Sequence, residues 1–301
     1  MEHKTKGLAT AYAILAAALY AINIPLSKLL MNHVQPTMMA AFLYLGAGLG
    51  LLVYSFIEKL IGKEVKREPL TKKELPYTVA MVLLDIAAPI LLMFGIEMTN
   101  SSNVSLLNNF EIVATSIIAL VIFKEIISKK LWGAIMLVTA ASVILSFGGE
   151  GALTFNYGSL FVIGACLCWG FENNCTKMIS NKSSVEIVII KGIFSGLGGL
   201  IVALILNEKI PAFLWIMCVL MLGFVAYGLS IHFYIMAQKD LGAAKTSAFY
   251  SISPFLGVMF SFLILNERPK IQFYIALVIM IISTLIMIKD TLPSEKEHKQ
   301  K

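Results

Sequence analysis

Charged residues are scarce in this sequence. Only 14% of its 301 residues are Asp, Glu, Lys or Arg, whereas 58% are hydrophobic, and the mean hydropathy is +0.83. A soluble domain carries about a quarter charged residues, and a soluble chain of this length exposes too much surface to do without them. The composition therefore argues against a soluble protein and predicts an integral membrane protein.

Cysteine pairs with the spacing of metal or redox sites are also absent. The four cysteines, Cys166, Cys168, Cys175 and Cys218, all lie in apolar stretches. Unpaired cysteines of this kind behave as small hydrophobic packing residues. We therefore expect no metal ion and no cofactor.

Catalytic and nucleotide-binding motifs are missing as well. The chain contains no H-E-x-x-H, no G-x-S-x-G and no phosphate-binding P-loop, and it has only four histidines. These absences argue against an intramembrane enzyme and against direct use of ATP. The net charge of +6 is better explained by lysines in membrane loops than by affinity for nucleic acid.

Long apolar runs fill most of the chain. Stretches such as LATAYAILAAALYAINIPL are hydrophobic on every helical face and have about the length that spans a bilayer. They predict an all-α membrane protein of about ten spans. The predicted spans are Gly7–Leu30, Thr37–Glu58, Leu75–Met98, Ser101–Phe123, Lys130–Phe147, Tyr157–Ile179, Val185–Leu206, Phe213–Gln238, Ala243–Leu265 and Ile271–Ile288.

The distribution of basic residues predicts the orientation in a cell (plasma or inner) membrane. With the N-terminus placed in the cytoplasm, nineteen of the 24 lysine and arginine residues lie on the inner side and four on the outer side, and Lys191 lies within a span. Cytoplasmic loops of membrane proteins are enriched in these residues. Both termini are therefore expected in the cytoplasm.

The sequence also repeats itself. ALYAINIPLSK (18–28) aligns with LCWGFENNCTK (167–177), so that Tyr20 matches Trp169 and Asn23 matches Glu172. This divides the chain into a first repeat, 1–150, and a second repeat, 151–301, with about five spans each. An odd number of spans places the repeats in opposite orientations, an arrangement typical of secondary transporters with a central binding site.

The ends of the two halves carry a family resemblance. FEIVATSIIALVIFKE is followed by LWGAIML, and ISPFLGVMFSFLILNE is followed by RPKIQFYIALVIM; each span ends at an acidic residue, Glu125 or Glu267. This doubled layout resembles the EamA-type repeats of the drug/metabolite transporter superfamily. The resemblance implies export of amino acids or related metabolites, with the proton gradient as a candidate driving force.

Polar residues form one stripe on each of four spans, at spacings that place them on one helical face. The stripes are Tyr20, Asn23 and Ser27; Ser101, Ser105, Asn108, Glu111 and Thr115; Trp169, Glu172 and Thr176; and Ser247, Tyr250, Ser253, Gly257 and Ser261. Single Ser and Thr residues often only join helices by hydrogen bonds. Four matched stripes together predict a polar pathway, because intramembrane polarity is usually functional.

Two glutamates are the strongest candidates in this pathway. Glu172 and Glu111 could each recognise a substrate amine or exchange a coupling proton, or could be held in a structural contact such as an ion pair. Asn173, next to Glu172, is expected to face the same pocket. Asn174 is expected to turn toward a neighbouring helix.

Three other ionisable residues allow two interpretations each. Asp85 could face the cavity or pair with a buried base. Lys191 could be a counter-charge to Glu172 or Glu111, or could extend its ammonium to the membrane surface. His232 could relay protons or could be a hydrogen-bonded packing residue.

Aromatic, proline and glycine residues add further expectations. Tyr20, Trp169 and Tyr250 could clamp the apolar part of a substrate or could be ordinary lipid-facing or core residues. Pro25 and Pro254 should kink their helices and could act as hinges. The glycines of the second and seventh spans predict close helix packing; these are Gly46, Gly48, Gly50, Gly196, Gly198 and Gly199.

These features together favour a secondary transporter. The predicted partners are a small amphipathic molecule and the lipid bilayer. A channel or a non-transporting membrane scaffold is the alternative, and an intramembrane enzyme is disfavoured by the missing motifs.

Overall fold

The computed structural model describes residues 2–61, 68–124, 128–146, 156–241, 246, 249–250, 252–266 and 271–291. All secondary-structure elements in these ranges are helices. Ser247, Glu125 and Glu267, which the sequence pattern singled out, lie outside the described residues.

The helices follow the predicted spans closely. In the first half they are α1 (Glu2–Ala21), α2 (Asn23–Leu30), α3 (Pro36–Leu60), the short 3-10 helix η1 (Lys72–Glu74), α4 (Leu75–Met98), α5 (Ser101–Leu107), α6 (Phe110–Val121) and α7 (Lys129–Ser146). In the second half they are α8 (Tyr157–Ile179), α9 (Ser184–Ile205), α10 (Phe213–Gly223), the π-helix η2 (Phe224–Leu229), α11 (Ser230–Leu241), α13 (Ser253–Leu265) and α14 (Ile271–Thr291).

Six of the described helical segments are long and apolar enough to cross a membrane. They are Gly7–Leu30, Pro36–Leu60, Lys72–Met98, Ser101–Val121, Ser184–Ile205 and Phe213–Leu241, and shorter apolar helices occupy Trp132–Ala141, Ser253–Leu265 and Ile271–Ile286. The chain is thus a multi-pass membrane protein. The sixth predicted span, α8, has 23 residues but is less apolar, because Glu172, Asn173 and Asn174 follow one another in it.

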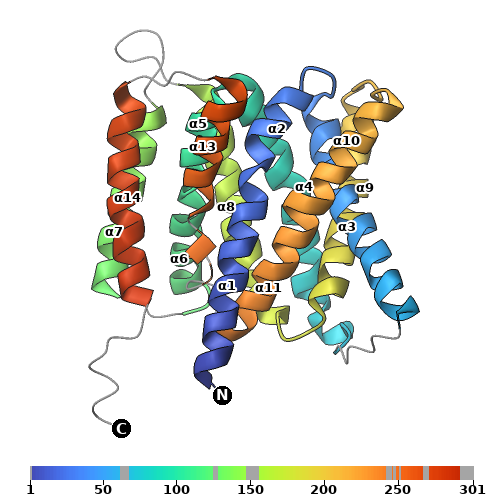
Figure 1. The fold of residues 1–301 in the computed structure, drawn as a ribbon, viewed down its shortest axis with the longest axis horizontal. Coiled ribbons are helices and arrows are strands. Elements are labelled where there is room, and N and C mark those ends of the chain that lie inside the picture. The colour runs from blue at the N-terminus through green and yellow to red at the C-terminus, as the bar shows by residue number, and fades with distance from the viewer. Residues whose placement is uncertain are drawn as a thin grey trace.

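The helices form an upright bundle (Figure 1). The start of α1 and the end of α14 lie at the same end of this bundle, which we call the terminal end; the opposite end is the far end. The polar helix α8 lies inside the bundle and contacts α4, α5, α6, α7 and α11. The paired helices α7 and α14 form one edge.

The first span is broken where the sequence places a proline. Helix α1 ends at Ala21, four residues before Pro25, and α2 begins at Asn23, two residues before Pro25. A proline cannot donate to the carbonyl four residues earlier, and its ring clashes with that carbonyl, so the helix breaks there. In the matching position of α8 stands Asn174, and α8 is unbroken.

Two irregular segments were not predicted. The fourth span was expected as one helix from Ser101 to Phe123, but it divides into α5 and α6 at Asn108 and Asn109. At this break the backbone hydrogen bonds span three residues instead of four. The Asn109 amide donates to the Leu106 carbonyl and the Ile112 amide donates to the Asn109 carbonyl, each at 3.1 Å. The eighth span contains the π-helical turn η2, a feature frequent at functional sites.

Glycines bring α3 and α9 into backbone contact. The sequence predicted close packing at glycines of these two spans but not which helices they would meet. A Cβ atom on Gly48 would lie 2.6 Å from the Ile193 nitrogen, and one on Gly196 would lie 2.7 Å from the Leu45 nitrogen. The tightest contact involves Gly192, which the sequence did not single out, because its Cβ would lie 2.3 Å from the Gly48 nitrogen. Side chains would hold these two helices apart.

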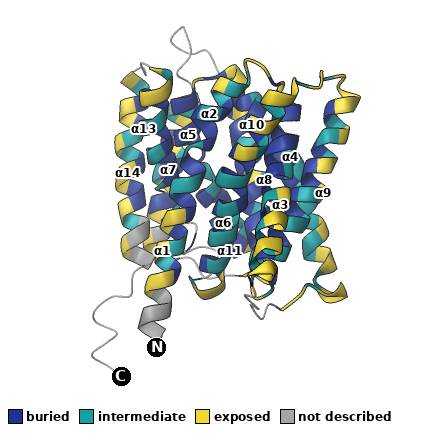
Figure 2. Ribbon diagram, turned by 45° about the vertical axis from the view of Figure 1, so that its right-hand side comes forward, coloured by how far each residue is buried: buried dark blue, intermediate teal, exposed yellow. Residues whose placement is uncertain are grey.

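Burial follows the arrangement expected for a helical protein in lipid. Buried residues line the inside of the bundle, whereas exposed residues lie on its outer faces and at its ends (Figure 2). Many exposed side chains are large and apolar, among them Val53, Phe56, Ile201 and Leu263. Such faces suit contact with lipid tails.

Candidate functional site

A central pocket lies between the helices of the two halves. It is lined by Tyr20, Tyr44, Glu111, Trp169, Glu172, Asn173, Thr176, Lys191, Tyr227, Ser230, Ile231, Tyr234, Ile235 and Tyr250. Its cavity volume is about 50 Å³. This is well below the roughly 300–1,000 Å³ of most small-molecule sites. As it stands, the pocket can hold a few waters or a small polar group.

A buried ion-pair network forms one wall of the pocket. The Lys191 Nζ atom on α9 lies 2.8 Å from Glu172 Oε1 on α8 and 3.1 Å from Asp85 Oδ2 on α4. Asp85 is 0% exposed, Glu172 2% and Lys191 4%. One ammonium group is thus shared by two carboxylates out of contact with bulk water, where removing a partner is costly.

Hydroxyl groups complete the coordination of both carboxylates. The Tyr44 hydroxyl on α3 donates to Asp85 Oδ1 at 2.7 Å, and Trp169 Nε1 in turn donates to the Tyr44 oxygen at 3.4 Å. Thr176, one turn after Glu172 on α8, donates its hydroxyl to Glu172. These bonds tie α3, α4, α8 and α9 together beside the pocket.

Glu111 occupies a different part of the pocket. It lies in the first turn of α6, directly after the break at Asn108 and Asn109. Asn173 Nδ2 donates to Glu111 Oε1 at 2.7 Å and also approaches Thr115 Oγ1 at 3.3 Å. Glu111 is only partly buried, and no ion pair to it occurs among the described residues. Its carboxylate therefore borders the open space of the pocket.

Aromatic rings form the other walls. Tyr20 stands at the centre of this group, with ring centroids 5.6 Å from Tyr227, 5.8 Å from Tyr250 and 6.5 Å from Trp169. Tyr234 continues the group at 5.0 Å from Tyr250. Neighbouring asparagines fix two hydroxyls, because Asn108 Nδ2 lies 3.3 Å from the Tyr20 oxygen and Asn23 Nδ2 lies 3.3 Å from the Tyr227 oxygen.

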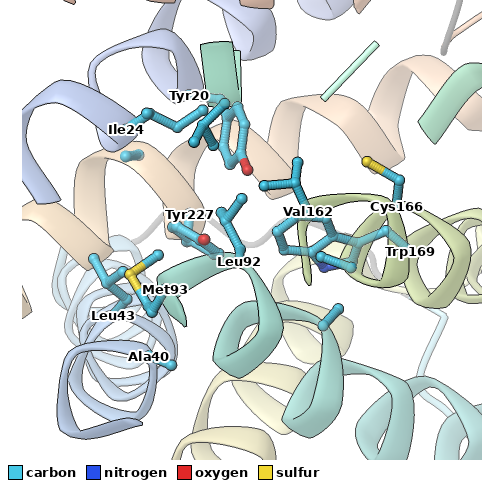
Figure 3. Close-up of a cluster of buried hydrophobic side chains, with 14 of the residues drawn as sticks. Tyr20, Ile24, Ala40, Leu43, Leu92, Met93, Val162, Cys166, Trp169 and Tyr227 are labelled. Atoms are coloured by element: carbon cyan, nitrogen blue, oxygen red, sulfur yellow. The ribbon is translucent and has the colours of Figure 1, made fainter. Parts of the chain in front are cut away.

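An apolar layer lies beside the aromatic rings of the pocket (Figure 3). Figure 3 shows Tyr20, Tyr227 and Trp169 around a common centre with Leu92 and Val162 between them. Leu92 lies in the last two turns of α4 and Val162 in the first two turns of α8, and both are fully buried. Figure 3 also labels Ile24, Ala40, Leu43, Met93 and Cys166 in this layer.

A second hollow adjoins the first. It has a cavity volume of about 20 Å³ and shares Tyr20, Glu111 and Tyr250 with the central pocket. Its remaining lining comes from the fourth and ninth spans, namely Asn108, Asn109, Ile112, Ser253 and Pro254. Glu111 thus stands at the junction of two cavities.

The structure brings most of the predicted site residues together. The central pocket contains Tyr20, Glu111, Trp169, Glu172, Asn173, Lys191 and Tyr250, and the adjoining hollow adds Asn108, Ser253 and Pro254. Asn174 turns toward α6, as expected, and its Nδ2 donates to the Thr115 carbonyl at 3.0 Å. Lys191 is buried with two carboxylates and does not extend to the membrane surface.

Four of the individually predicted residues do not line the cavities. Asp85 lies behind Lys191, Asn23 is buried behind Tyr227, and Pro25 is buried near the start of α2. His232 is on the face of α11 that meets the start of α9, where Nδ1 lies 3.1 Å from the Ser184 hydroxyl. Several members of the predicted stripes also lie outside both linings, namely Ser27, Ser101, Ser105, Thr115, Gly257 and Ser261.

Several pocket residues were missed by the sequence interpretation. Tyr227, Ser230 and Tyr234 follow the spacing i, i+3, i+7 on the eighth span, the same spacing that identified the stripe of the first span. This signal was available. Tyr44 offered no comparable signal, because the residues on either side of it in α3 are apolar.

The arrangement can recognise charge but offers no site for metal chemistry. Among the described residues, no group of three or more His, Cys, Asp or Glu side chains is placed to hold a metal ion. Two carboxylates, Asp85 and Glu172, contact the Lys191 ammonium, and a third carboxylate, Glu111, lines the same pocket without an ion pair among the described residues. In a medium of low dielectric constant such an excess must be balanced by protons or by a cationic ligand.

Comparison with known proteins gives consistent matches along the whole chain. The profile of the EamA-like transporter family matches residues 7–147 and 156–289. An uncharacterized transporter of Methanothermobacter thermautotrophicus (strain Delta H) is 25% identical over 91% of this chain and 84% of its own length. The uncharacterized transporter YyaM of Bacillus subtilis (strain 168) is 22% identical over 86% of this chain and 87% of its own length.

A solved structure shares the fold. A protein of known crystal structure superposes with a TM-score of 0.71, covering 95% of this chain and 98% of its own, at 15% sequence identity. At this identity the similarity concerns the fold alone.

Proposed function

This chain belongs to the EamA-like transporter family, and on that premise we propose that it is a secondary transporter that exports amino acids or related small amphipathic metabolites across the cell membrane. The substrate binds in the central pocket, and the protein alternates between states open to either side of the membrane. Both termini face the cytoplasm in this proposal, which the excess of basic residues in the inner loops supports.

The observation that carries the proposal is the pocket itself. A charged side chain in the middle of a membrane helix is unfavourable by about 2.5–3.5 kcal/mol on insertion scales. This chain gathers three carboxylates and an ammonium at one place between its helices, within a ring of aromatic side chains. A scaffold would gain nothing from that arrangement, whereas a carrier needs it to bind a polar substrate.

Alternating access is supported by matched contacts in the two halves. The pairs α1–α11 and α8–α4 correspond under the sequence alignment, as do α1–α13 and α8–α6, and each pair is in contact. We propose that the repeats 1–150 and 151–301 rock against each other around the pocket, as inverted repeats do in other transporters. The fully buried layer that includes Leu92 and Val162 is the gate closed in this state.

Coupling to protons is part of the proposal and is assigned to Glu172. Its carboxylate is shared with Lys191 and Thr176, so a proton that binds there would weaken the ion pair and loosen α8 from α9. Glu172→Gln should then abolish flux driven by a pH gradient while sparing exchange of substrate. An unchanged pH dependence in this variant would remove the role from Glu172.

The decisive experiment for transport is counterflow. Purified protein in liposomes loaded with a panel of unlabelled amino acids and amines should accumulate at least one radiolabelled member of the panel. Empty liposomes are the negative control, and a reconstituted carrier of known substrate is the positive control. Absence of counterflow for the whole panel, with the positive control working, would argue strongly against a carrier for this class of compound.

A further inference from the structure

We infer that the pocket recognises its substrate through an organic ammonium group, and that Glu111, rather than Glu172, is the carboxylate that binds it. The inference rests on the proposed transport function and narrows the substrate class. Three observations carry it: the state of Glu172, the position of Glu111 and the nature of the surrounding rings.

The carboxylate of Glu172 is already paired with groups of the protein itself. Its Oε1 atom lies 2.8 Å from Lys191 Nζ and also accepts a hydrogen bond from Thr176. The same ammonium lies 3.1 Å from Asp85. A ligand cation at Glu172 would therefore compete with Lys191 for this carboxylate, and displacing Lys191 would leave a buried ammonium with one carboxylate.

Glu111 has the opposite surroundings. Its described contact is a single amide donor, Asn173 Nδ2 at 2.7 Å, which fixes the carboxylate without neutralising it. Glu111 borders both the central pocket and the adjoining hollow, so a ligand can approach it from open space. Carboxylates that are fixed by a neutral donor and open on the other side are suited to binding a cation.

The rings next to Glu111 favour a cation as well. Tyr20 and Tyr250 line both cavities together with Glu111, and their centroids are 5.8 Å apart. Tyrosine faces attract ammonium groups within about 6 Å of the ring centroid, most strongly when the cation has lost its water. A carboxylate and two tyrosines therefore form three sides of a cation site.

The pocket offers no equivalent site for an anion. Lys191 is the one cationic side chain among its lining residues in the described chain, and two carboxylates engage it. A carboxylate or phosphate on the ligand would meet an excess of negative charge. We therefore expect an amine to bind more tightly than a neutral or acidic molecule of the same shape. Within the proposed substrates, this favours amines related to amino acids over amino acids that keep a free carboxylate.

Calorimetric titration of the full-length protein in detergent tests this with two probes. Phenethylamine carries an ammonium, and 2-phenylethanol replaces it with a hydroxyl on the same carbon skeleton. The amine should bind at least about tenfold more tightly, as expected when a charged hydrogen bond and a cation–π contact are both lost in the alcohol. Equal affinities of the two probes would overturn the inference.

Two variants then separate the glutamates. Glu111→Gln should remove most of the preference for the amine, and it should remove more than Glu172→Gln does. Glu97→Gln is the matched control, because Glu97 is an exposed glutamate at the end of α4 away from the pocket. The reverse ranking of the two pocket variants would assign the cation to Glu172 and overturn our inference. If Glu111→Gln does not fold, the ratio of the two probes on the unaltered protein still decides whether an ammonium is recognised.

Failure of the inference can be told apart from failure of the transport proposal. If phenethylamine binds with the expected preference but no panel member shows counterflow, the cation site stands and the carrier function fails. If a neutral or acidic compound shows counterflow while phenethylamine does not bind, the carrier function stands and the cation site fails.

Discussion

Lys191 is the residue on which the charge balance of the pocket depends. It lies on α9 with its ammonium between a carboxylate of α8 and a carboxylate of α4. Lys191→Met should therefore leave Asp85 and Glu172 buried without a counter-ion. Breaking one partner of a buried ion pair destabilises proteins by about 3–5 kcal/mol. The measurement is the melting temperature of the purified variant in detergent.

Two further variants make this prediction specific. Lys289→Ala removes an exposed lysine near the end of α14 and should leave the melting temperature unchanged. The triple variant Lys191→Met, Asp85→Asn, Glu172→Gln removes all three charges together and should recover much of the lost stability. If Lys191→Met melts like the unaltered protein, the network has no structural role.

At this scale the sequence identified the residues but not their partners. Glu172, Glu111, Asp85 and Lys191 stood out because ionisable residues are rare in apolar helices. Which of these residues pair depends on how four separate helices are rotated about their axes and how deep each lies in the membrane. A single sequence gives neither quantity. The separation of Glu111 from the Lys191 network became visible only from the packed side chains.

Among the elements, the contact between α3 and α9 depends on the absence of side chains at a few positions. Gly192→Ala would place a Cβ atom 2.3 Å from the Gly48 nitrogen, so the helices must move apart. Overpacking of this kind destabilises by about 1–3 kcal/mol. A matched control is Gly133→Ala in α7, where a Cβ would meet no atom within 4 Å. Thermal melts should separate the two, and equal melting temperatures would contradict the contact.

The break between α1 and α2 gives a second prediction for an element. Pro25→Ala would allow the amide of residue 25 to donate to the Ala21 carbonyl and would favour a continuous helix. We expect unchanged or higher stability with slower counterflow, since the hinge is proposed to serve the rocking motion. Pro36→Ala, at the first position of α3, is the control. A Pro25→Ala variant with full transport rate would show that the break is not needed.

The sequence predicted breaks only where it contained proline. The break at Asn108 and Asn109 is made by two residues that hydrogen-bond locally and compete with helix formation, a weaker and more common signal. The π-helical turn Phe224–Leu229 also has no simple sequence mark. Both segments nevertheless lie at the central pocket. The break directly precedes Glu111, and the π-helical turn contains Tyr227, and both of these residues line the pocket.

For the whole molecule, the testable feature is the side of the membrane on which the chain begins and ends. The described ends of α1 and α14 lie at the same end of the bundle (Figure 1). Fusions of green fluorescent protein to either terminus should fluoresce in a bacterial host, and fusions of alkaline phosphatase should be inactive. An active phosphatase at the C-terminus would contradict an even number of spans.

Composition alone was enough to predict the class of the molecule. Long apolar runs and scarce charge indicated an all-helical membrane protein, and the doubled span endings indicated the EamA family, which the profile match confirms. The division into repeats at residue 150 stays a prediction. The shape of the pocket could not be foreseen, because it is formed where four or more helices from both halves meet.

The polarity of α8 has a consequence for how the protein is made. Asn173 and Asn174 find their partners Glu111 and Thr115 on α6, which is synthesised earlier. Lys191, the partner of Glu172, lies on α9 and is synthesised later. During translation the partners of the α8 amides are therefore present before α8 is made, whereas the ammonium that pairs with its carboxylate follows only with α9.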